Sequence, residues 1–103
     1  MLQGLILEIA RIDVKPGLER EFEINVGKAL PIFQRVEGWR GMELRRSIEF
    51  PSRFHLLARW DSVESHTLAF RESAAFQQWR ELVGHCFARP PEVEHMTLSL
   101  IGH

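Results

Sequence analysis

The sequence predicts an α+β domain with a ferredoxin-like split βαβ arrangement, in which helices cover one face of an antiparallel sheet. Three observations lead to this fold class. Four stretches rich in branched or alternating apolar residues, typical of strands, begin near positions 5, 39, 54 and 93. Two intervening regions repeat apolar residues at helical spacing. The resulting order of strand, helix, strand, strand, helix pair and strand describes two split βαβ units with right-handed crossovers.

A turn separates the first strand from the first helix. Residues 5–14 form the strand, which Lys15-Pro16-Gly17 ends because proline cannot donate to a strand ladder and glycine tolerates a tight turn. The following helix contains Gly27 and Pro31, and we expect Pro31 to remove a hydrogen bond and kink the helix near Gly27. Its predicted buried stripe is Leu18, Phe22, Val26, Ala29 or Leu30, Phe33 and Val36.

The second and third strands are predicted to flank a turn at residues 50–52. Gly38 ends the first helix, and residues 39–48 then alternate apolar and polar side chains. Residues 54–60 form the third strand. We expect Met42, Leu44 and Ile48 to share one side of the second strand.

Two short helices and a last strand complete the predicted domain. We expect Asp61 to cap the first helix, with Glu64 as its capping-box partner three residues later. Ser73 is expected to cap the second helix, and Pro90-Pro91 ends this region. The second helix should bury Phe76, Trp79, Leu82 or Val83, and Cys86, and the last strand, residues 93–101, should place Met96, Leu98 and Leu100 on one face.

Composition limits the class of protein. A length of 103 residues suits a single domain spanning 1–103, and 45% hydrophobic with 26% charged residues is typical of a globular protein. Thirteen basic and fourteen acidic residues leave the net charge near zero. We therefore expect neither nucleic acid nor an anionic membrane as a partner. No stretch approaches the roughly 18 uninterrupted apolar residues that a spanning helix needs.

The cysteine count and the N-terminal residues bear on the compartment. The single cysteine, Cys86, excludes an internal disulfide and any Cys-based zinc site, and it fits a reducing cytoplasm. Gly4 and Glu8 lie in and beside the short apolar run at the N-terminus, which lacks a basic start, so we expect no signal peptide. These features predict a cytoplasmic protein without a metal site.

The first strand carries apolar residues on both of its sides. One set is Leu5, Leu7 and Ile9, and the other is Ile6, Ala10 and Ile12. A two-layer monomer would leave one of these sets in water. We therefore expect a C2 homodimer that pairs through the open face of the sheet.

Several motifs along the chain are those of a known family. They are Lys15-Pro16-Gly17 after the first strand, Glu37-Gly38-Trp39 before the second, residues 60–66 (WDSVESH) after the third, residues 70–80 (FRESAAFQQWR) and residues 90–95 (PPEVEH). From about Ile6 to Leu100 the chain resembles the antibiotic biosynthesis monooxygenase family of dimeric α+β barrels. The resemblance implies a homodimer with a pocket between sheet and helices in each protomer. Some members oxidise polycyclic aromatic phenols to quinones with molecular oxygen and neither metal nor flavin, and others open haem.

Three residues are candidates for catalysis. Trp60 could give the pocket a flat apolar wall and one hydrogen-bond donor, or it could be a core residue at a strand–helix junction. His66, spaced with Phe70, should lie on a buried stripe, where a neutral imidazole could exchange a proton with a phenol or bind backbone. Arg71, at the break between the two short helices, could stabilise an enolate or phenolate, or pair with Glu72.

Glu8, Phe70 and Trp79 are candidates for binding the substrate. Glu8 lies among apolar residues on one face of the first strand, so if that face meets the helices its carboxyl points into the pocket and burial raises its pKa. It is then a candidate base or the partner of an arginine. Trp79, at helical spacing with Phe76, fits the core as well as a pocket wall. His95 fits either an interface or the pocket rim.

The chain departs from the best-known members of this family. Where haem-degrading members carry an asparagine on the first strand it has Ala10, and their second-helix histidine falls at Phe70 or His66. These differences disfavour haem degradation. Quinone-forming members use an asparagine near the end of the third strand and a tyrosine, but residues 54–58 lack asparagine and the chain has no tyrosine. The sequence also lacks a glycine-rich phosphate loop, paired Cys/His spacing, a GxSxG elbow and an aromatic RNP pattern.

Two functional hypotheses remain. The first is a cofactor-independent monooxygenase that acts on a small phenol- or quinol-like aromatic with O2, in which the protein binds the anion and excludes water. The second is a non-catalytic dimeric domain that binds a small aromatic or apolar molecule. Oxygen uptake distinguishes them, because only the first consumes O2.

Overall fold

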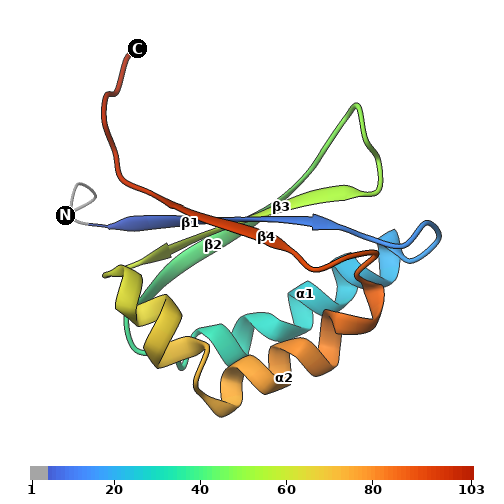
Figure 1. Cartoon of the computed structure of the whole chain (residues 1–103), viewed down its shortest axis with the longest axis horizontal. Helices are drawn as coiled ribbons and strands as arrows, with labels where there is room; N and C mark the ends of the chain where they lie inside the picture. Colours follow the sequence, from blue (N-terminus) through green and yellow to red (C-terminus); the bar gives the residue numbers. More distant parts are fainter. Residues whose placement is uncertain (1–4) are drawn as a thin grey trace.

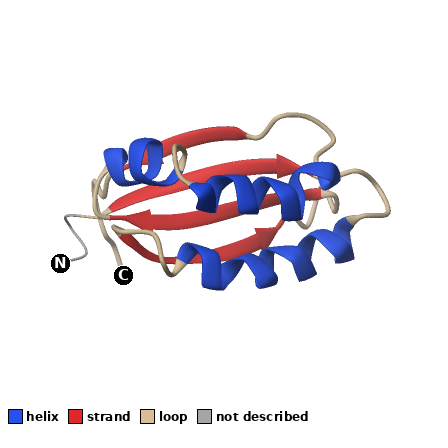
Figure 2. Ribbon diagram, turned by 90° about the horizontal axis from the view of Figure 1, so that it is seen from below, coloured by secondary structure: helices blue, strands red, loops and turns tan. Residues whose placement is uncertain are grey.

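A four-stranded sheet and the helices that cover one of its faces make up the fold, which the computed structural model describes for residues 5–103. Figure 1 shows α1 and α2 on the same side of the sheet, and Figure 2 shows the molecule from the helix side. The elements are β1 (Ile6–Asp13), α1 (Glu19–Phe33), β2 (Trp39–Arg46), β3 (Arg53–Trp60), η2 (Ser65–Phe70), α2 (Ala74–Val83), η3 (Gly84–Cys86) and β4 (Glu92–Met96).

The sheet has the strand order β2-β3-β1-β4, and every neighbouring pair is antiparallel. This is the order that two split βαβ units produce when both crossovers return on the same face. The predicted ferredoxin-like α+β fold, with helices on one face of an antiparallel sheet, is confirmed.

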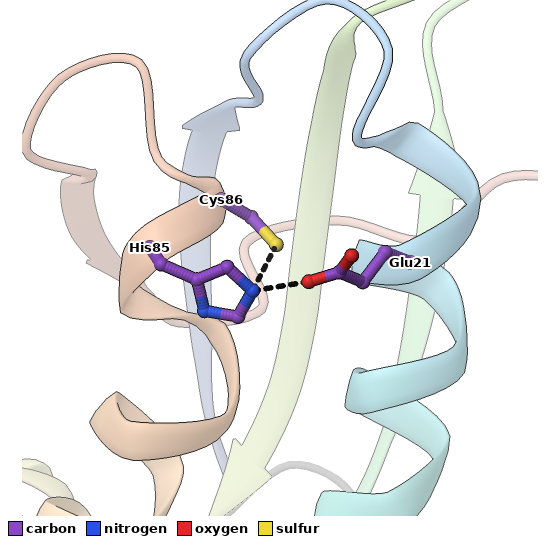
Figure 3. Close-up of side chains that lie close together, drawn as sticks. All are labelled: Glu21, His85 and Cys86. Atoms are coloured by element: carbon purple, nitrogen blue, oxygen red, sulfur yellow. Dashed lines mark hydrogen bonds and ion pairs between the residues drawn. The ribbon is translucent and has the colours of Figure 1, made fainter.

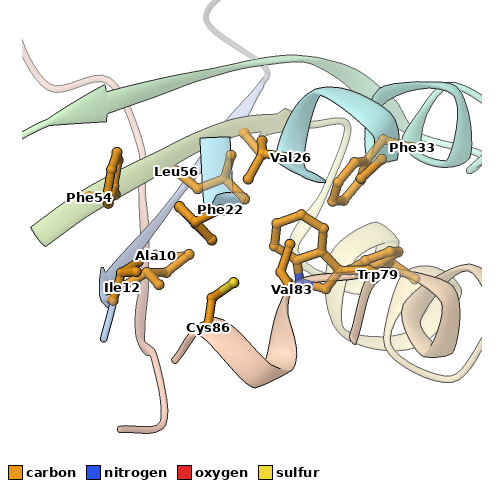
Figure 4. Close-up of a cluster of buried hydrophobic side chains, with 14 of the residues drawn as sticks. Ala10, Ile12, Phe22, Val26, Phe33, Phe54, Leu56, Trp79, Val83 and Cys86 are labelled. Carbon is orange, nitrogen blue, oxygen red and sulfur yellow. The ribbon is translucent and has the colours of Figure 1, made fainter. Parts of the chain in front are cut away.

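The face of β1 that carries Glu8 is the one that meets the helices. Its neighbours on this face, Ala10 and Ile12, are buried, and alternate residues of β3 are buried in the same way up to Trp60. Figure 4 shows the side chains from α1 and α2 that close this core, which include Phe22, Val26, Phe33, Trp79 and Val83.

The helix α1 runs without interruption from Glu19 through Gly27 to Phe33. Pro31 lies in its last turn, where the helix ends two residues later. The buried residues of α1 are Phe22, Val26, Ala29 and Phe33, which confirms the centre of the predicted stripe with Ala29 rather than Leu30. Its two ends, Leu18 and Val36, lie outside the helix and are partly buried.

The second strand is shorter than predicted. It ends at Arg46, and the Ser47 N–H then donates to the Arg53 carbonyl (2.9 Å), which closes the connection to β3. Ile48 lies in this connection and is 89% exposed. The prediction that Ile48 shares one side of the second strand with Met42 and Leu44 is therefore wrong, because the strand has already ended.

The last strand is also shorter than predicted. It ends at Met96, which pairs with Leu7, and β1 itself begins at Ile6. The predicted strand through residue 101 is wrong, because pairing with β1 ends at Met96 and residues 97–101 form no strand. Figure 1 shows the C-terminal segment leaving the sheet beyond this point.

Helical residues begin at Val63, just before η2, and the side chain that accepts a backbone N–H at this start is Ser62 and not Asp61. The Ser65 N–H donates to Ser62 Oγ (3.1 Å), whereas the Asp61 carboxylate accepts two hydrogen bonds, of 2.6 and 2.9 Å, from Arg40. The predicted Asp61 cap is wrong because a charged guanidinium is a stronger donor than a backbone amide. Ser73 does hold the N-cap position of α2, although its hydroxyl donates to the Phe70 carbonyl (2.6 Å).

The segment η2 is a π-helix. The Arg71 N–H donates to the His66 carbonyl five residues earlier (3.1 Å). Segments of this kind are rare and often occur at functional sites. This one carries His66 and Phe70 to the edge of the core, where both are buried.

Gly38 allows β2 to begin beside this helix. Its φ of +88° lies in the region that favours glycine, and a Cβ at this position would lie 2.7 Å from Ser65 Cβ. Two separate constraints therefore require glycine here.

Among residues 5–103, no helix is long and apolar enough to cross a membrane.

Candidate functional site

A cavity of about 320 Å³ lies between the inner face of the sheet and the helices. Such a volume suits a small organic ligand. One end is polar and is formed by Glu8, His66 and Arg71. The remaining walls are mostly apolar and include Ala10, Ile12, Leu56, Phe70, Phe76 and Trp79.

Glu8 places a carboxyl group at the polar end of the cavity. It is 6% exposed and accepts a hydrogen bond from Trp60 Nε1 (2.9 Å). The strand register explains the contact, because Glu8 lies opposite Ala58 and Trp60 is the diagonal neighbour on the same face. Burial raises the pKa of Glu8, and the Trp60 hydrogen bond and the Arg71 charge oppose that rise without cancelling it.

His66 lies beside Glu8 and is 2% exposed. Its Nε2 is 3.4 Å from Glu8 Oε1, and its Nδ1 is 2.8 Å from Nε2 of His95. Burial, followed by the positive charges of Arg71 and His95, lowers the pKa of His66 to about 4. The imidazole is therefore neutral at neutral pH, and its contact with Glu8 is not an ion pair.

A continuous polar chain results from these contacts. It runs from Trp60 on β3 to Glu8 on β1, then to His66 on η2 and His95 on β4. His95 lies directly opposite Glu8 in the β1–β4 ladder and is half-buried. The structure thus makes His95 the partner of His66, which the sequence placed only at an interface or a rim.

Arg71 lies in the turn between η2 and α2 and lines the cavity. Its positive charge lowers the pKa of both Glu8 and His66. In the part of the chain that the structure describes, Arg71 forms no ion pair with Glu72. Arg71 is an exposed residue that lines the cavity, so its side chain can meet an anion at this end.

The aromatic candidates divide between the wall and the core. Phe70 and Trp79 line the cavity, and both pack on Phe33 with ring centroids 5.1 Å apart. Trp60 is fully buried and does not line the cavity; its indole packs in a tilted arrangement behind His66, with ring centroids 5.4 Å apart, and supports Glu8. Trp60 therefore contacts Glu8 and His66 from behind and does not reach the cavity.

Sequence reasoning missed some of the lining. Arg80 and Phe33 both border the cavity, as do Phe87 and the Pro90-Pro91 pair. A signal for Arg80 was present, because it follows Phe76 by four residues and so shares its side of α2. No sequence signal separates Phe33 from the other members of the α1 stripe.

Comparison with known proteins gives a consistent result. The family profile described as antibiotic biosynthesis monooxygenase matches residues 5–82. YczJ, an uncharacterized protein of Bacillus subtilis (strain 168), is 34% identical over 91 residues, which cover 88% of this chain and 96% of YczJ.

Solved structures agree with these sequence matches. A Bordetella bronchiseptica protein, assigned provisionally as an antibiotic biosynthesis monooxygenase, has 51% identity and a TM-score of 0.93, with 95% of this chain and all of that chain covered. The protein Rv0793 of Mycobacterium tuberculosis has the same fold at 19% identity, with a TM-score of 0.75 and coverage of 96% and 99%.

Proposed function

Because this chain belongs to the antibiotic biosynthesis monooxygenase family, we propose that it oxidises a small phenol- or quinol-like aromatic with O2, without a metal or flavin. One observation carries the proposal. A buried carboxyl with a raised pKa, Glu8, adjoins a neutral imidazole, His66, at the polar end of an aromatic-walled cavity. A carboxyl whose pKa is raised by burial is suited to general acid–base work, and a neutral imidazole beside it can exchange a proton with it.

The cavity walls fit a flat aromatic substrate. Phe70, Phe76 and Trp79 offer ring faces and edges on which such a molecule could pack. A hydroxyl of the substrate at the polar end would lie near Glu8 and His66, which accept its proton. Arg71 then stabilises the resulting phenolate or enolate by its charge.

The substrate supplies the electrons in this reaction. With an anthrone-like compound, the carbanionic ring carbon transfers electrons to O2 and forms a bond to one oxygen atom. That atom becomes the new quinone carbonyl, and the other leaves as water with the two hydrogens lost from the same carbon. The protein binds the anion, moves the protons through Glu8 and His66, and excludes bulk water.

The residues present do not fit haem, which some relatives of this fold open. Both ring nitrogens of His66 are engaged, one by Glu8 and one by His95, so neither is free to ligate iron. Ala10, on the first strand, offers no polar group to a porphyrin.

Oxygen consumption tests the proposal. The full chain is incubated with anthrone-like and dihydroquinone substrates in an oxygen electrode cell, beside Glu8→Gln, His66→Ala and a control, His103→Gln. We expect uptake by the wild type and by the control, and much slower uptake by the other two. Substrate binding without uptake above the His66→Ala rate favours the second candidate, a non-catalytic domain that binds a small aromatic or apolar molecule.

We also propose that two copies pair through the outer face of the sheet. Leu7, Ile9 and Leu57 lie on that face and are only half-buried within one protomer. The C-terminal segment beside it exposes Leu98, Leu100 and Ile101. A second copy would cover this apolar surface, and a C2 pairing is the commonest way to do so.

A further inference from the structure

We propose that Glu21, His85 and Cys86 form a Zn²⁺ site outside the cavity. Figure 3 shows the three side chains converging from the start of α1 and from η3. Their ligand atoms, a carboxylate oxygen, an imidazole nitrogen and the thiol sulfur, all lie within 4.8 Å of one another. None of the three lines the cavity, so this site is separate from the proposed reaction.

Two of the three proposed ligands are open to solvent and the third is buried. The side chains of Glu21 and His85 are 49% and 50% exposed, whereas Cys86 is fully buried beneath them. His85 Nε2 contacts Glu21 Oε2 and also lies 3.5 Å from Cys86 Sγ. An ion can thus enter from solvent and still bind a sulfur atom that water does not reach.

Hydrogen bonds between the neighbouring elements hold these residues near one another without the ion. Asn25 Nδ2 donates to the Leu82 carbonyl (2.8 Å), which joins α1 to the end of α2. Glu21 lies one turn before Asn25, and His85 lies three residues after Leu82, so this bond joins the two elements close to both ligands. The Lys15 N–H donates to the Cys86 carbonyl (2.8 Å) and fixes the third ligand. Little ordering is therefore required on binding.

The donor set selects the class of metal. A thiolate, an imidazole and a carboxylate are the three side-chain ligands that Zn²⁺ uses, and water can complete a tetrahedron. Ca²⁺ and Mg²⁺ require mainly oxygen ligands, and this cluster provides them from one side chain only. A simple ion pair between Glu21 and His85 would not need the thiol, so the role of Cys86 is the distinguishing feature.

This proposal departs from the expectation that one cysteine excludes a Cys-based zinc site. That expectation rested on the cysteine count alone, whereas here helix packing brings Glu21 to the His85-Cys86 pair across more than half of the chain.

Cobalt titration tests the site, because Co²⁺ substitutes for Zn²⁺ and its spectrum reports the ligands. The full chain, without an affinity tag and freed of metal with a chelator, is titrated with Co²⁺ and then with competing Zn²⁺. We expect one equivalent to bind, visible bands of a tetrahedral ion, and a near-ultraviolet thiolate-to-cobalt band. We expect Cys86→Ser to abolish that band, and Glu21→Gln or His85→Asn to weaken Zn²⁺ binding by about tenfold or more.

Matched controls separate this site from adventitious binding. Glu23→Gln changes an exposed carboxylate on the same helix, and His103→Gln removes an exposed histidine near the C-terminus. Both should bind as the wild type does. Absence of the thiolate band, or Zn²⁺ affinity that is unchanged in Glu21→Gln and His85→Asn, would overturn the proposal. Because these two positions are half-exposed, the test does not depend on whether Cys86→Ser folds.

Discussion

Trp60 donates its indole N–H to Glu8 across a distance of 2.9 Å, in a place where the indole is fully buried and the carboxyl is 6% exposed. A buried carboxyl without a donor is costly, and so is a buried indole N–H without an acceptor. Each residue therefore satisfies the other. The pair also places one oxygen of Glu8 within 3.4 Å of His66, at the polar end of the cavity.

Replacing Trp60 with phenylalanine should destabilise the protein through this pair. Trp60→Phe keeps an aromatic ring but removes the donor and leaves a small void, so we expect a loss of about 2–4 kcal/mol in the free energy of unfolding. The Glu8→Leu background should reduce that loss, since no carboxyl is then left without a donor. Urea denaturation of the two single variants and the double variant measures the coupling. Strictly additive losses would contradict the contact.

Protonation of His66 should lower the stability of the folded protein at acid pH. Its folded pKa of about 4 lies below the ordinary value of 6.5, so the folded state favours the neutral imidazole. Above pH 6.5 the neutral imidazole makes its full contribution to the free energy of unfolding. As the pH falls toward 4 this contribution is lost, which lowers the free energy of unfolding by roughly 1–2 kcal/mol after allowance for solvent screening. His66→Gln should flatten this part of the curve, and His103→Gln should not. Urea midpoints measured across this range check the slope, and equal slopes in both variants would refute the assignment.

The ionisation of Glu8 should determine the acid limb of the pH–rate profile. A general base must be ionised, and because burial raises the pKa of Glu8, the rate constant kcat/KM should rise with pH above 4.5. Glu8→Gln should lose this limb and about 10²-fold or more of the rate. Glu94→Gln, an exposed change on β4, is the control. Oxygen uptake recorded across the pH range gives the profile, and a limb that persists in Glu8→Gln would assign it to another group.

Substitutions at Gly17 and Gly38 allow the cost of backbone strain to be measured apart from the cost of a steric clash. Gly38 and Gly17 both have positive φ, but a Cβ at Gly17 meets no atom within 4 Å, whereas one at Gly38 meets Ser65. Gly17→Ala should cost about 1 kcal/mol, which is typical of strain alone. Gly38→Ala should cost clearly more, because the start of η2 must also move. Thermal unfolding of both variants compares them, and equal losses would mean that η2 adjusts freely.

A charge on the outer sheet face should prevent pairing of two copies. Ile9 lies on this face, opposite Leu57 and Glu94 in the adjoining strands. Ile9→Glu should convert a dimer to a monomer in size-exclusion chromatography with light scattering. Lys28→Gln, which makes the same change in charge on the exposed side of α1, should leave the dimer intact. A wild-type chain that elutes as a monomer would refute the proposed interface.

The fold was predictable because its signals are local. The alternation in β1 and β3 and the helical stripe of α1 each depend on neighbouring residues, and the structure confirms them. The strand ends were not predictable in this way. Ile48 and Leu98 continue the apolar alternation of their strands, but β2 stops pairing with β3 after Arg46 and β4 stops pairing with β1 after Met96, and the local pattern marks neither end.

The site was predictable in part. Glu8 stood out as an acid among apolar residues, and His66 and Phe70 were correctly expected to be buried. The pairing of His66 with His95 depends on how η2 approaches β4, which is a tertiary contact between segments 29 positions apart. The cluster around His85 likewise depends on the packing of η3 against α1, and each of its residues is ordinary in isolation.

The π-helical winding of η2 means that the number of residues in this connection matters as much as their identity. Each residue of an α-helix turns the chain by about 100°, and a turn of π-helix contains more residues than a turn of α-helix. Removing one residue between His66 and Arg71 would restore ordinary winding and rotate the side chains that follow to new directions. A change of length here would therefore alter which groups face the cavity, whereas in an ordinary surface loop it would alter only the loop.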